Sequence, residues 1–435
     1  MNQSISIIGL GKLGSCMAAA YASKGHNVIG VDINDKFVSA LDGGRAPVQE
    51  TDLQKYIDEN KSRISATPDY GKAVNNSDIT FIIVPTPTDH TGGFSVDYVL
   101  KSCEDIGRAL KGKDTYHLVV LTSTVLPGDC DEKIIPALEK FSGKACGKDF
   151  GFCYNPEFIA IGTVIRDLLN PDFFLIGEFD QRSGDLLEKF YSVSSNNNAR
   201  ILRMNIPTAE LTKISINHYL TTKITFANML AEVAHSISGV HVDKVTEALG
   251  SDTRIGHKYL RGGLGFGGPC FPRDNRAFAT MAQRRGIGVP YAQITDDYNK
   301  GIADRMINIV LTYAEPQSRI GVLGLSYKPG TGFCEESQGL NIAKKLAQNY
   351  QVGVHEPSGH YHAETLLNDA VKYYEDPDSL LENSDIIFLT NWDKNNNLLK
   401  GKKFEAKKII IDPWRQFTAD DFSGEAVYVP LGIGR

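Results

Sequence analysis

The fold is most constrained by the start of the chain, where two short apolar runs enclose a glycine turn and a helical pattern. The run SISII is followed directly by GLGKLG, then by SCMAAAYASKG, whose apolar residues recur at helical spacing, and then by NVIGVD. A phosphate-binding glycine fingerprint requires this order of strand, turn, helix and strand. The order therefore predicts a parallel βαβ unit.

Each glycine of the turn has its own predicted role. Gly9 makes the tight turn, Gly11 lets the backbone approach a pyrophosphate, and Gly14 allows the helix to pack closely on the strand. The N–H groups at the start of the helix meet the negative charge. Asp32, at the end of the second apolar run, would accept hydrogen bonds from both ribose hydroxyls and repel a 2′-phosphate. We therefore expect NAD rather than NADP.

Further apolar runs, separated by helical stretches, continue the pattern. They lie at residues 79–88, 117–128, 150–158 and 173–178. This alternation predicts a doubly wound parallel sheet, in which ligands bind beyond the carboxyl ends of the strands. The polar residues at those ends are Thr86, Ser123, Thr124 and Glu157. Helix caps or closed turns would explain each of them as readily as a functional role.

The pattern changes at Pro207. Apolar residues there recur at helical spacing for about thirty residues, which predicts one long helix with Thr208 as its N-cap. A third region opens at residues 319–333, again with a strand followed by a glycine turn. It lacks a complete GxGxxG and has Glu356 after its second strand, so we expect this α/β unit to bind something other than a second dinucleotide.

A chain of 435 residues exceeds what one hydrophobic core usually covers. We predict an α/β protein with an N-terminal Rossmann-type doubly wound parallel sheet, a central long-helix domain and a C-terminal Rossmann-like α/β domain. The predicted bounds are 1–200 for the NAD-binding domain, 201–305 for the central helical domain and 306–435 for the third domain.

Composition argues against several other classes of protein. The net charge is -6 with both signs interspersed, which favours neither a nucleic acid nor a membrane surface as partner. No apolar run approaches the ~20 residues of a membrane span, and the first residues lack the basic region of a signal peptide. The 7 cysteines are scattered without a CxxC pair, which is typical of a reducing cytoplasm. We interpret His355, His360 and His362 as loop histidines and expect no metal site.

One cysteine has an unusual setting. In GFGGPCFPRD, Cys270 follows three glycines and lies between two prolines. Glycine permits close approach and proline fixes the backbone, so the segment is shaped for another group to come near the sulfur. Asp274 follows about one helical turn later. Lys213 and Asn217 lie four residues apart, hence on one face of the long helix, where Lys213 could be a solvated lysine or a catalytic cation.

These motifs resemble those of the UDP-glucose/GDP-mannose dehydrogenase family, whose members share a GFGGSCFPKD-like loop. The resemblance extends along almost the whole chain, through VPTPT, TSTVLPG, YNPEF, ELTKISINHYLTTKI and DTRIGHKYL. It implies that a nucleotide sugar is oxidised twice by NAD, with Cys270 holding the intermediate aldehyde first as a thiohemiacetal and then as a thioester. The RIG segment favours UDP-glucose, and GDP-mannose and N-acetylated UDP-hexoses are the alternatives.

The resemblance also implies roles for the site residues. Lys213 stabilises the thiolate and the developing alkoxide, and Asn217 donates a hydrogen bond. Asp274 and Thr124 position or deprotonate the attacking water, and Glu157 matches an active-site glutamate. The implied sugar-nucleotide contacts are Phe158, Ile159, Lys213, Asn217, Arg254, Tyr259, Leu260, Phe266, Phe271 and Lys328. Arg254 matches an arginine that reaches a neighbouring subunit, which implies a homodimer through the central domain.

Three places depart from the family pattern. Ile161 occupies the position of a glutamate in the family, and Glu335 occupies that of an arginine. The segment DPWRQ takes the place of the family's DxRN pattern. Two other functions therefore stay open. A single-step β-hydroxyacid-type dehydrogenase also pairs a lysine with an asparagine but needs no cysteine, and a catalytically silent protein could bind the nucleotide sugar without turnover.

Overall fold

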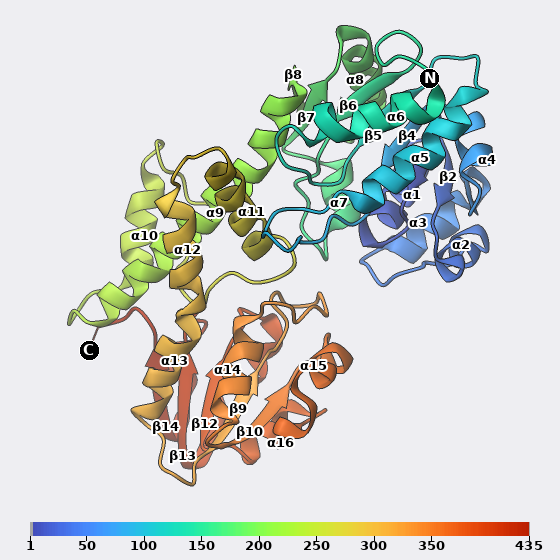
Figure 1. Ribbon diagram of the computed structural model, residues 1–435. Helices are drawn as coiled ribbons and strands as arrows, with labels where there is room; N and C mark the ends of the chain where they lie inside the picture. Colours follow the sequence, from blue (N-terminus) through green and yellow to red (C-terminus); the bar gives the residue numbers. More distant parts are fainter. Residues whose placement is uncertain (1–2, 435) are drawn as a thin grey trace. The chain divides into compact units, whose positions relative to one another are not determined.

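The computed structural model describes residues 3–434, except for the side chains of residues 360–362 and 394–395. The chain divides into two compact units, residues 1–215 and residues 216–435 (Figure 1). Each unit contains one β-sheet with helices packed on it.

The first unit is built on an eight-stranded sheet with the order β3-β2-β1-β4-β5-β6-β7-β8. Its strands are β1 (Ser4–Ile8), β2 (Asn27–Val31), β3 (Ile64–Thr67), β4 (Ile79–Ile82), β5 (Leu118–Leu121), β6 (Gly151–Tyr154), β7 (Phe173–Glu178) and β8 (Arg200–Asn205). The chain turns from one side of β1 to the other between β3 and β4, which makes the carboxyl end of β1 the topological switch point. The predicted Rossmann-type fold is confirmed.

One pair of strands departs from the all-parallel prediction. β6 and β7 are antiparallel, with Cys153 opposite Glu178 and Tyr154 opposite Gly177, whereas β7 and β8 are again parallel. The parallel direction predicted for β7 is therefore wrong, because a buried apolar run reads the same in either direction. β8 was not predicted, since none of its residues is fully buried and its sequence RILRMN lacks an apolar run.

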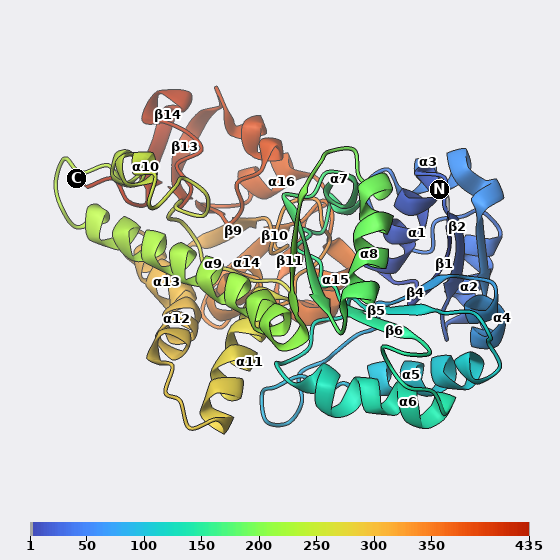
Figure 2. The same cartoon turned by 90° about the horizontal axis from the view of Figure 1, so that it is seen from above.

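Helices cover both faces of this sheet (Figure 2). One apolar cluster joins the strands to α1 (Lys12–Ser23), α2 (Asp35–Asp42), α3 (Leu53–Asn60), α7 (Val164–Leu169) and α8 (Gln181–Ser194). The other joins them to α4 (Tyr70–Asn75), α5 (Asp97–Lys111), the turn Cys130–Ile134, α6 (Ile135–Ser142) and the start of α9 (Ile206–His235). Figure 2 shows α5 and α6 side by side.

The predicted long helix is α9, which has 30 residues. Its predicted N-cap is wrong: the amide of Thr208 donates to the side chain of Asn205 at 3.0 Å, so the cap is Asn205. A capping oxygen accepts from an amide two or three residues further on, and Asn205 meets that condition. The first turns pack tightly on β7, because a Cβ on Gly177 would lie 2.7 Å from the Cβ of Ala209.

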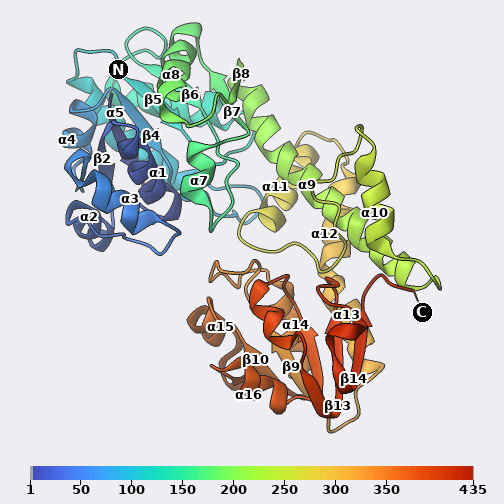
Figure 3. The same ribbon diagram turned by 180° about the vertical axis from the view of Figure 1, so that it is seen from behind.

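The second unit contains a six-stranded parallel sheet with the order β11-β10-β9-β12-β13-β14 (Figure 3). Its strands are β9 (Arg319–Leu323), β10 (Gln351–His355), β11 (Lys372–Tyr373), β12 (Ile386–Leu389), β13 (Lys403–Asp412) and β14 (Ser423–Pro430). The order repeats that of the first six strands of the first unit. The predicted C-terminal Rossmann-like fold is confirmed, although β11 and β14 were not predicted.

The helices of the second unit share an apolar core with this sheet. One cluster contains residues of α10 (Val242–Ser251), α13 (Ile302–Leu311), α14 (Gln338–Leu346) and α15 (His360–Leu367), together with the end of α9. α16 (Pro377–Glu382) belongs to a second cluster. The remaining helices are α11 (Phe271–Arg284) and α12 (Pro290–Lys300). The boundaries at 200 and 305 stay predictions.

Candidate active site

The glycine turn after β1 has the geometry of a phosphate cradle. Gly9 has a φ of 102°, and its amide donates to the carbonyl oxygen of Val31 at 2.7 Å. A Cβ on Gly14 would lie 1.8 Å from the Gly9 oxygen, whereas one on Gly11 would meet nothing within 4 Å. No side chain caps α1, so the amides of its first turn can bind a diphosphate.

Asp32 is held in place by the backbone beside this turn. Its two carboxylate oxygens accept from the amides of Leu10 at 2.6 Å and Asn34 at 2.7 Å. Each oxygen can accept a further hydrogen bond, which leaves capacity for two ribose hydroxyls. The turn and Asp32 together fit NAD.

We expect Asp32→Ala to weaken NAD⁺ binding by about 10- to 100-fold, because hydrogen bonds to a charged group contribute about 1.5–3 kcal/mol. The affinity for the nucleotide sugar should stay within about twofold on the same scale. Calorimetric titration with each ligand measures both effects. Asp35→Ala, at the exposed start of α2, is the control. Equal losses of affinity for both ligands would contradict this placement of the ribose.

The hydroxyl groups at the ends of β4 and β5 are tied to backbone groups. Ser123 Oγ donates to the carbonyl of Val84 at 2.7 Å and accepts from the amide of Val84 at 2.9 Å. Thr86 Oγ1 donates to the carbonyl of Thr124 at 2.7 Å. These contacts favour a turn-closing role for Ser123 and Thr86, while their contacts with NAD stay predictions.

Lys213 is buried rather than solvated. It is 7% exposed, its Nζ donates to the carbonyl oxygen of Glu157 at 2.7 Å, and the Nζ lies 4.7 Å from the ring centroid of Phe158. Burial raises the pKa of Glu157 to about 7, and the charge of Lys213 opposes that rise. Within the described part of the chain, the enclosed Oε1 of Glu157 has no hydrogen-bond partner. A carboxyl group in this state can exchange a proton with a ligand near neutral pH.

Cys270 occupies the N-cap position of α11 and is exposed, whereas the other six cysteines are buried. The positive end of a helix dipole stabilises a thiolate at this position. The glycines before it serve packing rather than access to the sulfur. A Cβ on Gly267 would lie 2.5 Å from the carbonyl oxygen of Glu336, and one on Gly268 would lie 2.7 Å from the ring of Tyr327.

Asn217 and Asp274, both predicted catalytic residues, are in direct contact. Asp274 is 1% exposed, and its Oδ2 accepts from Nδ2 of Asn217 at 2.6 Å. Its Oδ1 accepts from Nε and Nη2 of Arg273, both at 3.1 Å. Asp274 therefore orients the amide of Asn217, while its action on water stays a prediction.

The predicted sugar-nucleotide contacts of the second unit differ in exposure. Leu260 and Phe266 are 4% and 5% exposed, so they form part of the core beneath the loop. Tyr259 is 45% exposed and has a φ of 65°, a strained conformation for a residue other than glycine. The ring centroid of Phe271 lies 6.5 Å from that of Tyr259. Arg254 is exposed and pairs with Asp252 of its own loop at 2.6 Å.

A cavity of about 310 Å³ lies at the carboxyl ends of β9, β10 and β12. Gly324 in its lining repeats the geometry of Gly9, with a φ of 95° and an amide that donates to the carbonyl of His355 at 2.9 Å. Glu356, also in the lining, differs from Asp32. Its carboxylate accepts from the amides of Leu325, Ser326, Ser358 and Gly359. This acid is therefore saturated, and it cannot bind a ribose as Asp32 can.

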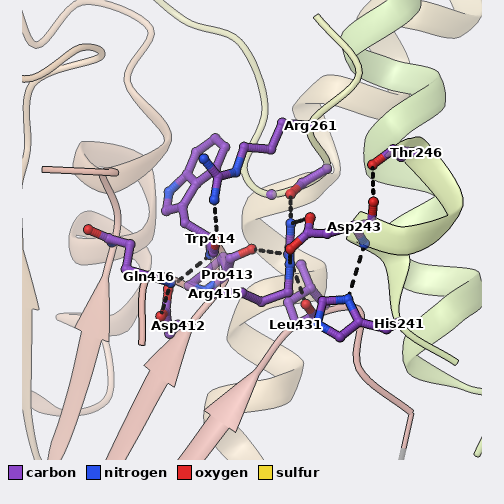
Figure 4. Close-up of polar contacts among 12 residues, drawn as sticks. His241, Asp243, Thr246, Arg261, Asp412, Pro413, Trp414, Arg415, Gln416 and Leu431 are labelled. Carbon is purple, nitrogen blue, oxygen red and sulfur yellow. Dashed lines mark hydrogen bonds and ion pairs between the residues drawn. The ribbon is translucent and has the colours of Figure 1, made fainter. Parts of the chain in front are cut away.

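Arg415 of the DPWRQ segment joins the C-terminal sheet to α10 (Figure 4). Its Nε and Nη2 donate to the carboxylate of Asp243 at 2.9 and 2.8 Å. Its other N–H groups donate to the carbonyls of Gly262, Pro413 and Leu431. These contacts use all five donors of the guanidinium, so Arg415 has no donor left for a ligand.

Two absences concern only the residues that the structure describes. Among them, no group of three or more His, Cys, Asp and Glu side chains could hold a metal ion, and the side chains of His360 and His362 lie outside the described part. No helix within residues 3–434 is long and apolar enough to cross a membrane. Three predicted substrate contacts are half-buried: Phe158, Ile159 and Lys328. Their role in binding the substrate stays a prediction.

Three domain models of one family match the chain. They are the NAD binding domain, over residues 3–194, the central domain, over 207–301, and the UDP binding domain, over 321–419, of the UDP-glucose/GDP-mannose dehydrogenase family. A GDP-mannose 6-dehydrogenase of Pseudomonas savastanoi pv. phaseolicola is 32% identical over 427 residues, covering 93% of this chain and 95% of the relative. The UDP-glucose 6-dehydrogenase AglM of Haloferax volcanii is 32% identical over 422 residues, covering 95% of this chain and 97% of the relative.

A solved structure indicates the same family. A UDP-glucose dehydrogenase from the hyperthermophilic archaeon Pyrobaculum islandicum is 31% identical and has a TM-score of 0.90, over 99% of this chain and 97% of that one. The fold and these matches define an NAD-dependent oxidoreductase that acts on nucleotide sugars. The chain belongs to the UDP-glucose/GDP-mannose dehydrogenase family, which confirms the resemblance found in its sequence.

Proposed function

We propose that this dehydrogenase oxidises UDP-glucose to UDP-glucuronate in two successive steps. The main support is Cys270, an exposed thiol at the N-cap of α11 in a chain whose other cysteines are buried. A single oxidation to an aldehyde needs no nucleophile. A second oxidation needs the aldehyde to be held and activated, and a thiolate does both.

Two hydride transfers and one hydrolysis convert the primary alcohol of the sugar into an acid. When bound, NAD⁺ accepts one hydride in each oxidation. The sulfur of Cys270 forms a bond with the aldehyde carbon, and the carbonyl oxygen takes a proton to complete the thiohemiacetal. Loss of the second hydride and of that proton leaves a thioester. Water then cleaves the carbon–sulfur bond, which releases the carboxylate and returns the thiolate. Each sugar therefore consumes one water and yields two NADH and three protons, which pass to the solvent.

The residues of the site have matching proposed roles. Lys213 supplies the positive charge for the developing alkoxide, and its burial strengthens that interaction. The Glu157 carboxyl, whose pKa burial raises to about 7, exchanges protons during the hydrolysis of the thioester. Asp274 orients the amide of Asn217. We propose that the nucleotide diphosphate binds to the second unit, and the match of residues 321–419 to the UDP binding domain supports this.

The choice of UDP-glucose rests on the RIG segment and on two of the relatives. The Haloferax volcanii and Pyrobaculum islandicum proteins are both named for UDP-glucose. GDP-mannose is the second candidate, because the Pseudomonas savastanoi GDP-mannose 6-dehydrogenase has the same 32% identity. UDP-N-acetylhexosamines complete the set that a substrate test must contain.

The test is a panel of nucleotide sugars incubated with excess NAD⁺. UDP-glucose, GDP-mannose, UDP-N-acetylglucosamine and UDP-N-acetylmannosamine are each followed by NADH absorbance and by chromatography of the acid. We expect UDP-glucose to have the highest kcat/KM and to yield two NADH for each acid. A higher kcat/KM for GDP-mannose would refute the proposed sugar but not the chemistry. One NADH with accumulation of an aldehyde or ketone would indicate a single-step dehydrogenase, and binding without turnover a silent protein.

We also propose that the protein is a homodimer that associates through α9. Exposed apolar side chains form a stripe on this helix, made of Tyr219, Phe226, Met229 and Val233. Tyr219, Phe226 and Val233 recur every seven residues, which places them on one face of the helix. Such a contiguous apolar stripe on an exposed helix is typical of a protein interface.

We expect the double variant Phe226→Glu, Val233→Glu to elute as a monomer, because four charges would be buried at a symmetric interface. Light scattering coupled to size-exclusion chromatography measures the mass. Leu311→Glu is the control. Leu311 lies on α13 rather than α9, and its exposed fraction of 44% is close to the 43% of Phe226. A monomeric wild type, or a double variant that remains dimeric, would refute this interface.

A further inference from the structure

Helix α9 carries a second buried charged residue, for which the chemistry above gives no role. Glu210 lies one turn before Lys213 and is 0% exposed. Its Oε2 accepts from the amide of Gly128 at 2.7 Å, and its Oε1 accepts from the amide of Cys130 at 3.0 Å. Both amides lie in the TSTVLPGDC loop, residues 122–130, which follows β5, includes Thr124 and runs into the helical turn that begins at Cys130. One side chain thus joins this loop to α9.

The ionisation of Glu210 is set by its burial and by its hydrogen bonds. Burial raises the pKa of Glu210 to about 6, and the hydrogen bonds from Cys130 and from the two backbone amides oppose that rise. The negative charge of Asp129 adds to it. Glu210 is therefore mainly ionised at pH 7, and a carboxylate accepts from backbone amides more strongly than a neutral group does.

The other described hydrogen bonds of the loop reach β4 and the segment that follows it, where Thr86 Oγ1 donates to the carbonyl of Thr124, or stay within residues 122–133. Ser123 is tied to Val84 at the end of β4. Asp129 accepts from the amide of Leu126 at 2.9 Å and pairs with Lys133 at 2.7 Å. Glu210 reaches the loop from α9, and Lys213 on the same helix reaches the carbonyl of Glu157 after β6. Two residues one turn apart therefore hold the segments that follow two neighbouring strands.

We propose that Glu210 is a positioning residue for the dehydrogenase reaction. Its carboxylate fixes residues 122–130 against α9, so that Thr124 and Lys213 keep one relative position. The inference rests on the proposed function, because Thr124 and Lys213 must act on the same sugar. Reaction rates depend steeply on such geometry, and a misplacement of about 1 Å can cost on the order of 100-fold.

Glu210→Gln is the test variant, and Asp129→Asn is its matched control. Glutamine keeps the size of the side chain but removes the charge and presents an N–H group to one of the two backbone amides. Asp129→Asn weakens the internal contacts of the same loop and leaves its link to α9 intact. We expect Glu210→Gln to lower kcat by about 10- to 100-fold while both KM values stay within about threefold. Asp129→Asn should lower kcat by less than about threefold.

The two kinetic parameters distinguish positioning from general loosening. If both variants lower kcat equally, or if Glu210→Gln raises KM in proportion to its loss of kcat, the proposal is wrong. If Glu210→Gln does not fold, Glu210→Asp, which keeps the charge but shortens the side chain, is measured against the same control and by the same criteria. A wild-type protein that produces no NADH would instead refute the proposed function, so the two failures are distinguishable.

Discussion

Cys270→Ser is expected to abolish formation of the acid product while NAD⁺ still binds with the affinity of the wild type. A thiol is partly ionised near neutral pH and is intrinsically nucleophilic, whereas a serine hydroxyl is neither without a dedicated base. We expect acid formation to fall by about 10³-fold or more, in the range seen when a covalent nucleophile is removed. Chromatography of the sugar products and calorimetric titration with NAD⁺ measure the two effects.

The control for this variant is Cys146→Ser, which makes the same change at a buried thiol of the first unit. It should retain wild-type acid formation. Mass spectrometry of the intact protein during turnover should show the sugar attached to wild-type enzyme and absent from Cys270→Ser. Unimpaired acid formation by Cys270→Ser would refute the covalent mechanism, whatever the substrate.

Lys213→Met should lower kcat by about 10²- to 10³-fold, the usual cost of removing one donor to a developing oxyanion. Methionine keeps much of the apolar stem and removes the charge from a side chain that is 7% exposed. Because the charge of Lys213 lowers the pKa of Glu157, its loss should raise that pKa above about 7. The Glu157 carboxylate then forms only at higher pH, so the acid limb of the kcat profile should move to higher pH.

Lys223→Met is the matched control on the same helix. Lys223 donates to the carbonyl of Ile255 in the RIG segment at 3.1 Å, whereas Lys213 donates to the carbonyl of Glu157. Lys223→Met should change kcat by less than about threefold and leave the pH profile unmoved. Equal losses in the two variants, or an unshifted acid limb in Lys213→Met, would count against the predicted role of Lys213.

Predictions from sequence succeeded where the determining contacts are local. The turn between β1 and α1 is built from residues adjacent in the chain, so Gly9, Gly11 and Gly14 could be assigned separate roles before the structure was known. The long apolar pattern likewise predicted the helix α9. Its start was wrong by a few residues, because both Thr208 and the earlier Asn205 are good caps and the choice depends on how α9 packs against β7.

The candidate site was predicted only in part. The sequence singled out Lys213, Asn217, Cys270 and Asp274, and the structure joins Asn217 to Asp274 across 57 residues. It did not indicate Glu210, because a glutamate in an amphipathic helix is ordinary, and its amide partners lie about 80 residues away. The glycines near Cys270 were interpreted as access to the sulfur, and the structure shows that they pack against residues 327 and 336 instead.

By itself, the sequence determined the glycine cradle, the preference for NAD, the two α/β units and the family, because each depends on residue types at fixed short spacings. The tertiary structure alone decided the direction of β7 and the burial of Lys213 and Glu210. It also decided that backbone groups occupy the hydrogen-bond acceptors of Glu356, and that all the donors of Arg415 are used within the protein. The physical reason is the same in each case. A strand direction or the partner of a buried charge is set by groups far away in the chain, and local spacing carries no record of them.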